Sequence, residues 1–90
     1  MELKRGQVVK SRAGRDKDSY MAVLELAPPW VVLADGKRRP VERPKRKKLM
    51  HISPTLRVLS EEALATNRKL RAALREAGGQ GENTPYDAEV

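Results

Sequence analysis

The sequence has no cysteine, a single histidine, one tryptophan, two tyrosines and no phenylalanine. The absence of cysteine excludes disulfides and thiolate-bound metals, and it agrees with a reducing compartment. With His51 as the only histidine, a Cys–His nucleophilic pair and a histidine-rich metal site are excluded too. For His51 itself we favour a partly buried structural role over a contact with a base or phosphate. We predict that the protein is not an enzyme, and we expect no cofactor and no small-molecule substrate.

Long apolar runs are also missing. No run approaches the roughly 20 residues that a helix needs to cross a bilayer. Residues 1–10 carry charges where a signal peptide needs its apolar stretch. We therefore expect a soluble, cytoplasmic protein. An anionic membrane surface is a poor candidate partner, because the most basic segment contains prolines and few bulky apolar residues.

Positive charge is in excess and is unevenly distributed. The formal net charge is +7. Residues 1–54 contain 14 Lys and Arg against 6 Asp and Glu (+8), whereas residues 55–90 contain 5 against 6 (−1). Charge segregated in this way creates a field that attracts a polyanion. The simpler alternative is a solvated, basic surface without a partner.

Short segments with β-branched residues, separated by turn residues, predict a β-domain. Asp35-Gly36 is the strongest hairpin signal, and it predicts that Trp30–Ala34 pairs with the segment directly after it. Because Trp30–Ala34 is apolar on both faces, we expect it to be the most buried strand. Five short strands predict a small barrel or sandwich. The expected strands are Gln7–Ser11, Tyr20–Leu26, Trp30–Ala34 and Leu49–Ile52, and Lys37–Arg43 is expected to be a polar strand or an extended arm.

The composition changes after residue 54. Ser60 is a suitable N-cap for a helix, with Glu61 and Glu62 in its first turn. Apolar residues then recur at helical spacing up to Ala77 and form one stripe, and Gly78-Gly79 should end the helix. The stripe needs a cover, either the β-domain or a partner. We divide the chain into a β-domain (1–54), a helical segment (55–77) and a disordered tail (78–90).

A basic turn with a central glycine lies between the first two expected strands. Gly14 allows the main chain a positive φ or a close approach to another group. Arg12, Arg15 and Lys17 would project around this turn, with backbone amides nearby, and a phosphate fits among such groups. Asp16 stands in the same turn and is interpreted as a turn former, because no further ligands accompany it for a metal.

The second basic feature is the segment 37–48, in which 8 of 12 residues are Lys or Arg and Glu42 is the single acid. Pro40 and Pro44 favour an extended arm, so its charges spread along a line as phosphates do along a strand. If the arm and the turn together meet about 6 phosphates, log K should fall against log salt with a slope near −5.

Aromatic side chains that could stack on bases are scarce. Recognition of bases in single-stranded RNA usually uses exposed aromatic side chains. The candidates are Trp30, Tyr20 and Tyr86. Trp30 opens an apolar strand, so we favour burial in the core over base stacking for it, and for Tyr20 both roles stay open. The scarcity favours recognition of folded RNA by its shape and phosphates.

The residues around Gly14 resemble the KOW motif, a strand–loop–strand unit in a small SH3-like barrel. That motif is often written around Gly-x-Asp-Lys-Gly, and Ala13-Gly14-Arg15-Asp16-Lys17 matches it, with valines before and after. Asp18 stands where the motif usually has glycine, but aspartate tolerates left-handed backbone angles better than most residues. Residues 34–39, 43–47 and His51 also follow the pattern of small bacterial KOW proteins related to archaeal and eukaryotic large-subunit ribosomal proteins. The resemblance covers residues 3–52 and implies an SH3-like barrel and RNA binding.

We therefore expect a mainly β protein with a small SH3-like barrel, one C-terminal α-helix and a disordered tail. The expected function is binding of structured RNA, with ribosomal RNA and the ribosome as the expected partners. The alternative is a protein-interaction module that docks on the transcription or translation machinery through the helical stripe. The sequence does not indicate the oligomeric state. The cations expected to contact RNA are Arg5, Arg12, Arg15, Lys17, Lys37, Arg38, Arg39, Arg43, Lys45, Arg46, Lys47 and Lys48.

Overall fold

The fold is an antiparallel β-sheet followed by two helices, as the computed structural model describes it for residues 3–79. The strand order is β4-β3-β2-β1-β5. This confirms the predicted class, a mainly β chain of five strands with a helix near its C-terminal end. The strands are β1 (Gln7–Ser11), β2 (Tyr20–Ala27), β3 (Trp30–Ala34), β4 (Lys45–Lys48) and β5 (Ile52–Val58). The helical elements are the 3-10 turns η1 (Gly14–Asp16) and η2 (Leu49–His51) and the helices α1 (Glu61–Leu64) and α2 (Asn67–Gly79).

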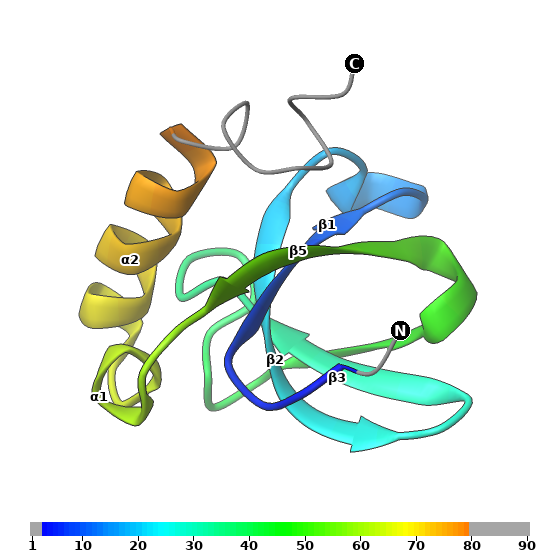
Figure 1. Cartoon of the computed structure of the whole chain (residues 1–90), viewed down its shortest axis with the longest axis horizontal. Coiled ribbons are helices and arrows are strands. Elements are labelled where there is room, and N and C mark those ends of the chain that lie inside the picture. The colour runs from blue at the N-terminus through cyan, green and yellow to red at the C-terminus, as the bar shows by residue number, and fades with distance from the viewer. Residues whose placement is uncertain (1–2, 80–90) are drawn as a thin grey trace.

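The sheet is bent, but it is not closed into a barrel. Within residues 3–79 no ladder joins β4 to β5, so the sheet is open. The closed SH3-like barrel expected from the KOW resemblance is therefore not formed by these residues. Register shifts lie between Gln7 and Val9 on β1 and between Val23 and Glu25 on β2. Bulges of this kind bend a strand and increase its twist. Figure 1 shows the result, with β5 crossing beside β1 and β3 curling below them.

Two expected strands lie elsewhere in the chain. The segment Lys37–Arg43 is an irregular loop, and β3 pairs instead with β4, which begins at Lys45. The carboxylate of Asp35 explains the difference. Its Oδ1 atom accepts hydrogen bonds from the N–H groups of Lys37 and Arg39, both at 2.8 Å. Such a bond pattern turns the main chain away from a ladder. Asp35-Gly36 thus opens the connection 35–44, which we call the basic loop.

The predicted strand Leu49–Ile52 is also displaced. Residues 49–51 form the turn η2, and β5 starts at Ile52 and continues to Val58, past the expected boundary at residue 54. The Leu49 N–H donates to the carbonyl of Pro29 at 2.9 Å, so this turn is anchored to the β2–β3 connection.

Apolar residues fill both faces of the sheet because neighbouring pairs of the β1–β2 ladder point to opposite sides. Val8 is paired with Ala22, and the next pair is Val9 with Met21. The first pair belongs to a helix-side cluster, completed by Ala34, Leu64, Leu70, Leu74 and Ala77. The second belongs to an inner cluster, completed by Val23, Val31, Leu33 and Ile52. The residues of β2 alternate in this way from Tyr20 to Leu24.

The C-terminal apolar stripe packs on the sheet. Of the two covers that the sequence allowed, the β-domain or a partner, the structure shows the β-domain. Ser60 is the N-cap of α1, as predicted: its Oγ atom accepts from the Ala63 N–H at 3.2 Å. A break after α1 divides the expected single helix, because the Thr66 hydroxyl accepts from the Lys69 N–H at 3.1 Å and caps a second helix. Figure 1 shows both helices on one flank of the sheet.

The helix α2 continues through Gly78 and Gly79, the residues expected to end it. The rest of the expected disordered tail, residues 80–90, lies outside the described residues. Among the residues that are described, no helix has both the length and the apolar character to cross a membrane.

The basic loop is fastened to the start of α2. Gly36 is buried with φ +78, and a Cβ placed on it would lie 2.5 Å from the Asn67 carbonyl oxygen. The Asn67 Oδ1 atom accepts from the N–H of Val41 at 2.8 Å. Arg71 donates from Nη1 to the Gly36 carbonyl at 3.2 Å. These contacts require a residue without a side chain at position 36.

We expect Gly36→Ala to lower the free energy of unfolding by roughly 3 kcal/mol, because a left-handed angle and a backbone clash act together. Gly14→Ala is the matched control. Gly14 has φ +79, but its Cβ would meet nothing closer than the Lys47 Nζ at 3.4 Å, an ordinary van der Waals distance. Its expected cost is about 1–2 kcal/mol. Denaturant unfolding of both variants measures the difference, and equal losses would show that the contact of Gly36 with α2 is unimportant.

Candidate nucleic-acid interface

The turn around Gly14 has a defined main-chain geometry. Gly14 and Asp18 both have left-handed angles, with φ +79 and +70, a conformation that aspartate tolerates better than most residues. The Asp18 N–H donates to the Ser11 carbonyl at 2.7 Å. The Lys17 N–H closes η1 on the Gly14 carbonyl at 3.2 Å. The side chains of Arg15 and Lys17 are exposed around this turn.

Arg12 lies beside the turn η2 and the start of β5. Its N–H donates to the His51 carbonyl at 2.8 Å, and its Nη1 donates to Ser53 Oγ at 2.9 Å. His51 is half-buried, which agrees with the structural role that we favoured for it. Arg12 is exposed, so its guanidinium is anchored to β5 and still faces solvent.

Lys47 points into the protein, unlike its neighbours on β4. It is 7% exposed, and its Nζ donates to the carbonyl of Ala13 at 2.7 Å. Lys47 is paired with the buried Val31, so the alternation of β4 places it on the inner side of the sheet. The ammonium group that we expected to contact RNA therefore joins β4 to the Gly14 turn.

Trp30 lies outside both core clusters and is half-buried, in contrast to the burial that we favoured. The β3–β4 register places Arg46 and Lys48 on the same face as Trp30, with the guanidinium carbon of Arg46 4.6 Å and the Nζ of Lys48 5.6 Å from the ring centroid. The ring is thus covered by two cations instead of apolar side chains. For the same reason β3 is not the most buried strand, since Val32 on this face is also half-buried.

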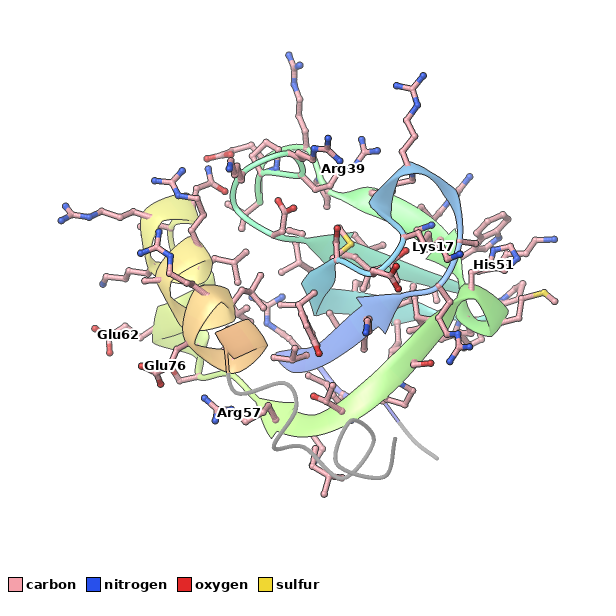
Figure 2. All side chains as sticks on the ribbon, turned by 90° about the horizontal axis from the view of Figure 1, so that it is seen from above. Lys17, Arg39, His51, Arg57, Glu62 and Glu76 are labelled. Atoms are coloured by element: carbon pink, nitrogen blue, oxygen red, sulfur yellow. The ribbon has the colours of Figure 1, made fainter. Side chains whose placement is uncertain are left out.

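The exposed cations come from three segments, the Gly14 turn, the basic loop and β4. Figure 2 shows that Lys17 and Arg39 lie along one side of the molecule, with His51 on the same side, whereas Glu62, Glu76 and Arg57 lie on the other. Arg39 and Lys45 are half-buried. The exposed cations of the three segments, which we call the basic surface, are Arg15, Lys17, Lys37, Arg38, Arg43, Arg46 and Lys48.

Arg5 has a structural partner. Its Nε lies 3.0 and 2.8 Å from the two carboxylate oxygens of Glu61, and its Nη1 donates to the Leu24 carbonyl at 2.8 Å. The hydrogen bond from Arg5 holds the pKa of Glu61 below its ordinary value of 4.5. Arg5, predicted to contact RNA, therefore joins α1 to β2.

A hollow of about 340 Å³ opens between the start of β2, the basic loop and α2. Arg71 and Arg75 of α2 line it, and sequence reasoning missed both residues. Their four-residue spacing places them on one helix face. The neighbours of that helix face depend on how α2 packs on the sheet, and the sequence alone does not show this packing. The other lining residues are Ser19, Tyr20, Asp35, Lys37 and Leu74.

Comparison of the chain with protein-family models and with curated proteins finds no match. Among residues 3–79, no group of three or more His, Cys, Asp or Glu side chains is placed to hold a metal ion. A functional assignment must therefore rest on the charge and geometry of the basic surface.

Lys47→Met tests the structural role of the buried ammonium group. Methionine keeps much of the stem but leaves the Ala13 carbonyl without its charged donor, so we expect unfolding free energy to fall by about 1.5–3 kcal/mol. Lys48→Met on the same strand should cost no more than about 1 kcal/mol, the contact of an exposed cation with Trp30. Thermal or denaturant unfolding compares the two, and equal effects would contradict a special role for Lys47.

Glu61→Gln tests the ion pair with Arg5 through its pH dependence. Because the pKa of Glu61 is lowered in the folded state, the pair stabilises the fold above the ordinary pKa of 4.5 and loses this effect as the pH falls through the lower folded value. We expect wild type to be more stable than Glu61→Gln at pH 7 and the difference to shrink below pH 4.5. Arg5→Gln should remove the same pH-dependent part. A difference that does not change with pH would contradict the pairing.

Proposed function

We propose that this protein binds structured RNA, and that the basic surface contacts the phosphates. The observation that carries the proposal is the gathering of exposed cations from three separate segments, with the acidic residues Glu62 and Glu76 on the other side of the molecule (Figure 2). An excess of positive charge on a surface attracts a polyanion and orients it before contact.

Fixed main-chain positions support the same proposal. Lys47 holds β4 to the Gly14 turn, and Asn67 and Arg71 hold the basic loop to α2. Cations that project from ordered segments need less ordering when they bind than cations on a mobile tail. The basic surface therefore suits a ligand with a defined arrangement of phosphates, such as a folded RNA.

The state of the aromatic rings favours contact with phosphate and shape over base stacking. The Trp30 ring lies under Arg46 and Lys48, and the Tyr20 ring has the Lys10 Nζ 5.7 Å from its centroid. A base that stacked on these rings from the same side would have to displace a cation. The cations themselves remain placed for phosphate contacts.

The resemblance of the Gly14 turn to the KOW motif is our reason to name RNA rather than DNA. Ribosomal RNA in the cytoplasm is the target that we propose, in line with the ribosomal proteins that this group resembles. The alternative, a protein-interaction module, was suggested by the apolar helical stripe, and this stripe packs on the sheet. Leu70, Leu74 and Ala77 of the helical stripe are buried against the sheet.

The proposal is tested by measuring the affinity for a purified RNA hairpin as a function of salt. For wild type we expect log K to fall against log salt with a slope near −5, which corresponds to about 6 phosphate contacts. The double variant Lys17→Gln/Arg38→Gln should reduce the steepness of the slope by about 2. The double variant Arg57→Gln/Lys69→Gln removes the same charge next to Glu76 and Glu62 and should leave the slope unchanged.

Three results would contradict the proposal. The first is a wild type without salt-dependent binding, and the second is an equal reduction of the slope by both double variants. The third is a DNA duplex of the same length that binds as tightly as the RNA hairpin. The third result would leave a general polyanion binder instead of an RNA-binding protein.

A further inference from the structure

The hollow between β2, the basic loop and α2 has a lining that suits an anion. Three cations, Lys37, Arg71 and Arg75, line it together with one acid, Asp35. The Asp35 Oδ1 atom already accepts two main-chain N–H groups, those of Lys37 and Arg39. These bonds partly offset the negative charge that Asp35 presents, so the balance of the lining is positive.

The cations of the hollow are well placed for a ligand. Arg71 uses its Nη1 to hold the Gly36 carbonyl, and this bond fixes a guanidinium that carries five N–H donors in all. Within residues 3–79, the side chains of Lys37 and Arg75 form no ion pair or hydrogen bond with another residue. Both are exposed, so an incoming phosphate meets donors that have no competing partner in this part of the chain.

The volume of the hollow favours a ligand larger than a phosphate group. A volume of about 340 Å³ lies at the lower end of the roughly 300–1,000 Å³ of pockets that hold a small molecule, although this hollow is widely open to solvent. The remaining lining is partly apolar, with Leu74 and the Tyr20 ring, and Ser19 adds a hydroxyl. An anion with an attached planar or apolar group fits this lining better than inorganic phosphate does.

We propose that this hollow binds one nucleotide, with the phosphate among Lys37, Arg71 and Arg75 and the sugar and base against Leu74 and Tyr20. Lys10, the cation over the Tyr20 ring, does not line the hollow, so a nucleotide there does not have to displace it. The inference deepens the proposed RNA binding and rests on it for the source of the nucleotide. Ser19 and Tyr20 directly follow the Gly14 turn, and Lys37 belongs to the basic loop. An RNA strand on the basic surface therefore reaches the hollow without leaving the protein, and α2 becomes part of the interface.

Two sources of the nucleotide are possible, a residue within an RNA strand or a free mononucleotide. We choose the hexanucleotide rA6, AMP and inorganic phosphate as probes, followed by amide and methyl NMR signals of Ser19, Tyr20 and Leu74. If the site takes RNA, rA6 should bind at least tenfold more tightly than AMP, and inorganic phosphate should cause no comparable shifts. AMP binding as tight as that of rA6 would assign the hollow to free nucleotides.

Arg75→Gln is the diagnostic variant, because Arg75 is exposed and has no structural bond in the described part of the chain. It should weaken rA6 binding three- to tenfold and reduce the shifts at Leu74. Arg68→Gln is the matched control, since Arg68 is an exposed arginine of the same helix that does not line the hollow. It should change the affinity less than twofold, and unchanged melting temperatures confirm that both variants fold.

The outcomes separate this inference from the proposed function. Equal weakening by Arg75→Gln and Arg68→Gln, with tight RNA-hairpin binding by wild type, would overturn the nucleotide site and leave RNA binding standing. AMP binding that depends on Arg75, without any RNA-hairpin binding, would overturn RNA binding and leave the site. Shifts caused equally by inorganic phosphate and AMP would also overturn the nucleotide site.

Discussion

Leu70 and Leu74 of α2 reach the sheet because Ala22 and Ala34 leave room for them there, and Val8 completes this contact. The position of the basic loop depends on this apolar packing. Once α2 lies on the sheet, its first turns face the loop, and Asn67 and Arg71 bind the loop main chain. Burial of this kind is the main stabilising term for a short helix in water. The apolar cluster on one side of the sheet thus determines where cations stand on the surface.

The basic residues of this chain have two different uses. Some act as long structural donors: Lys47 binds the Ala13 carbonyl and Arg5 binds Glu61 and the Leu24 carbonyl. Others, such as Lys17 and Arg38, are exposed and have no such role in the described residues. Composition counts both kinds alike, so net charge alone overstates the number of cations available to a polyanion.

Local signals in the sequence were enough to predict the strands β1 to β3 and the helix cap at Ser60. They failed where a distant contact decides the structure. The hairpin that Asp35-Gly36 predicted does not form, because Asp35 Oδ1 accepts hydrogen bonds from two main-chain N–H groups of the loop and Gly36 contacts α2. The partial exposure of Trp30 depends on the pairing of β3 with β4. The sequence does not show this pairing, because it depends on the length of the loop between the two strands. The lining of the hollow combines residues from three elements, which no local pattern brings together.

The open sheet leaves β4 as an edge strand among the described residues, and this strand reads Lys45-Arg46-Lys47-Lys48. An unpaired edge exposes main-chain donors and acceptors on which the strand of a second molecule can add. Two such edges would bring rows of like charges face to face, which is unfavourable. The same cations that we assign to phosphate contacts therefore oppose edge-to-edge aggregation of the free protein. A polyanion that neutralises them would weaken this protection and at the same time cover the edge.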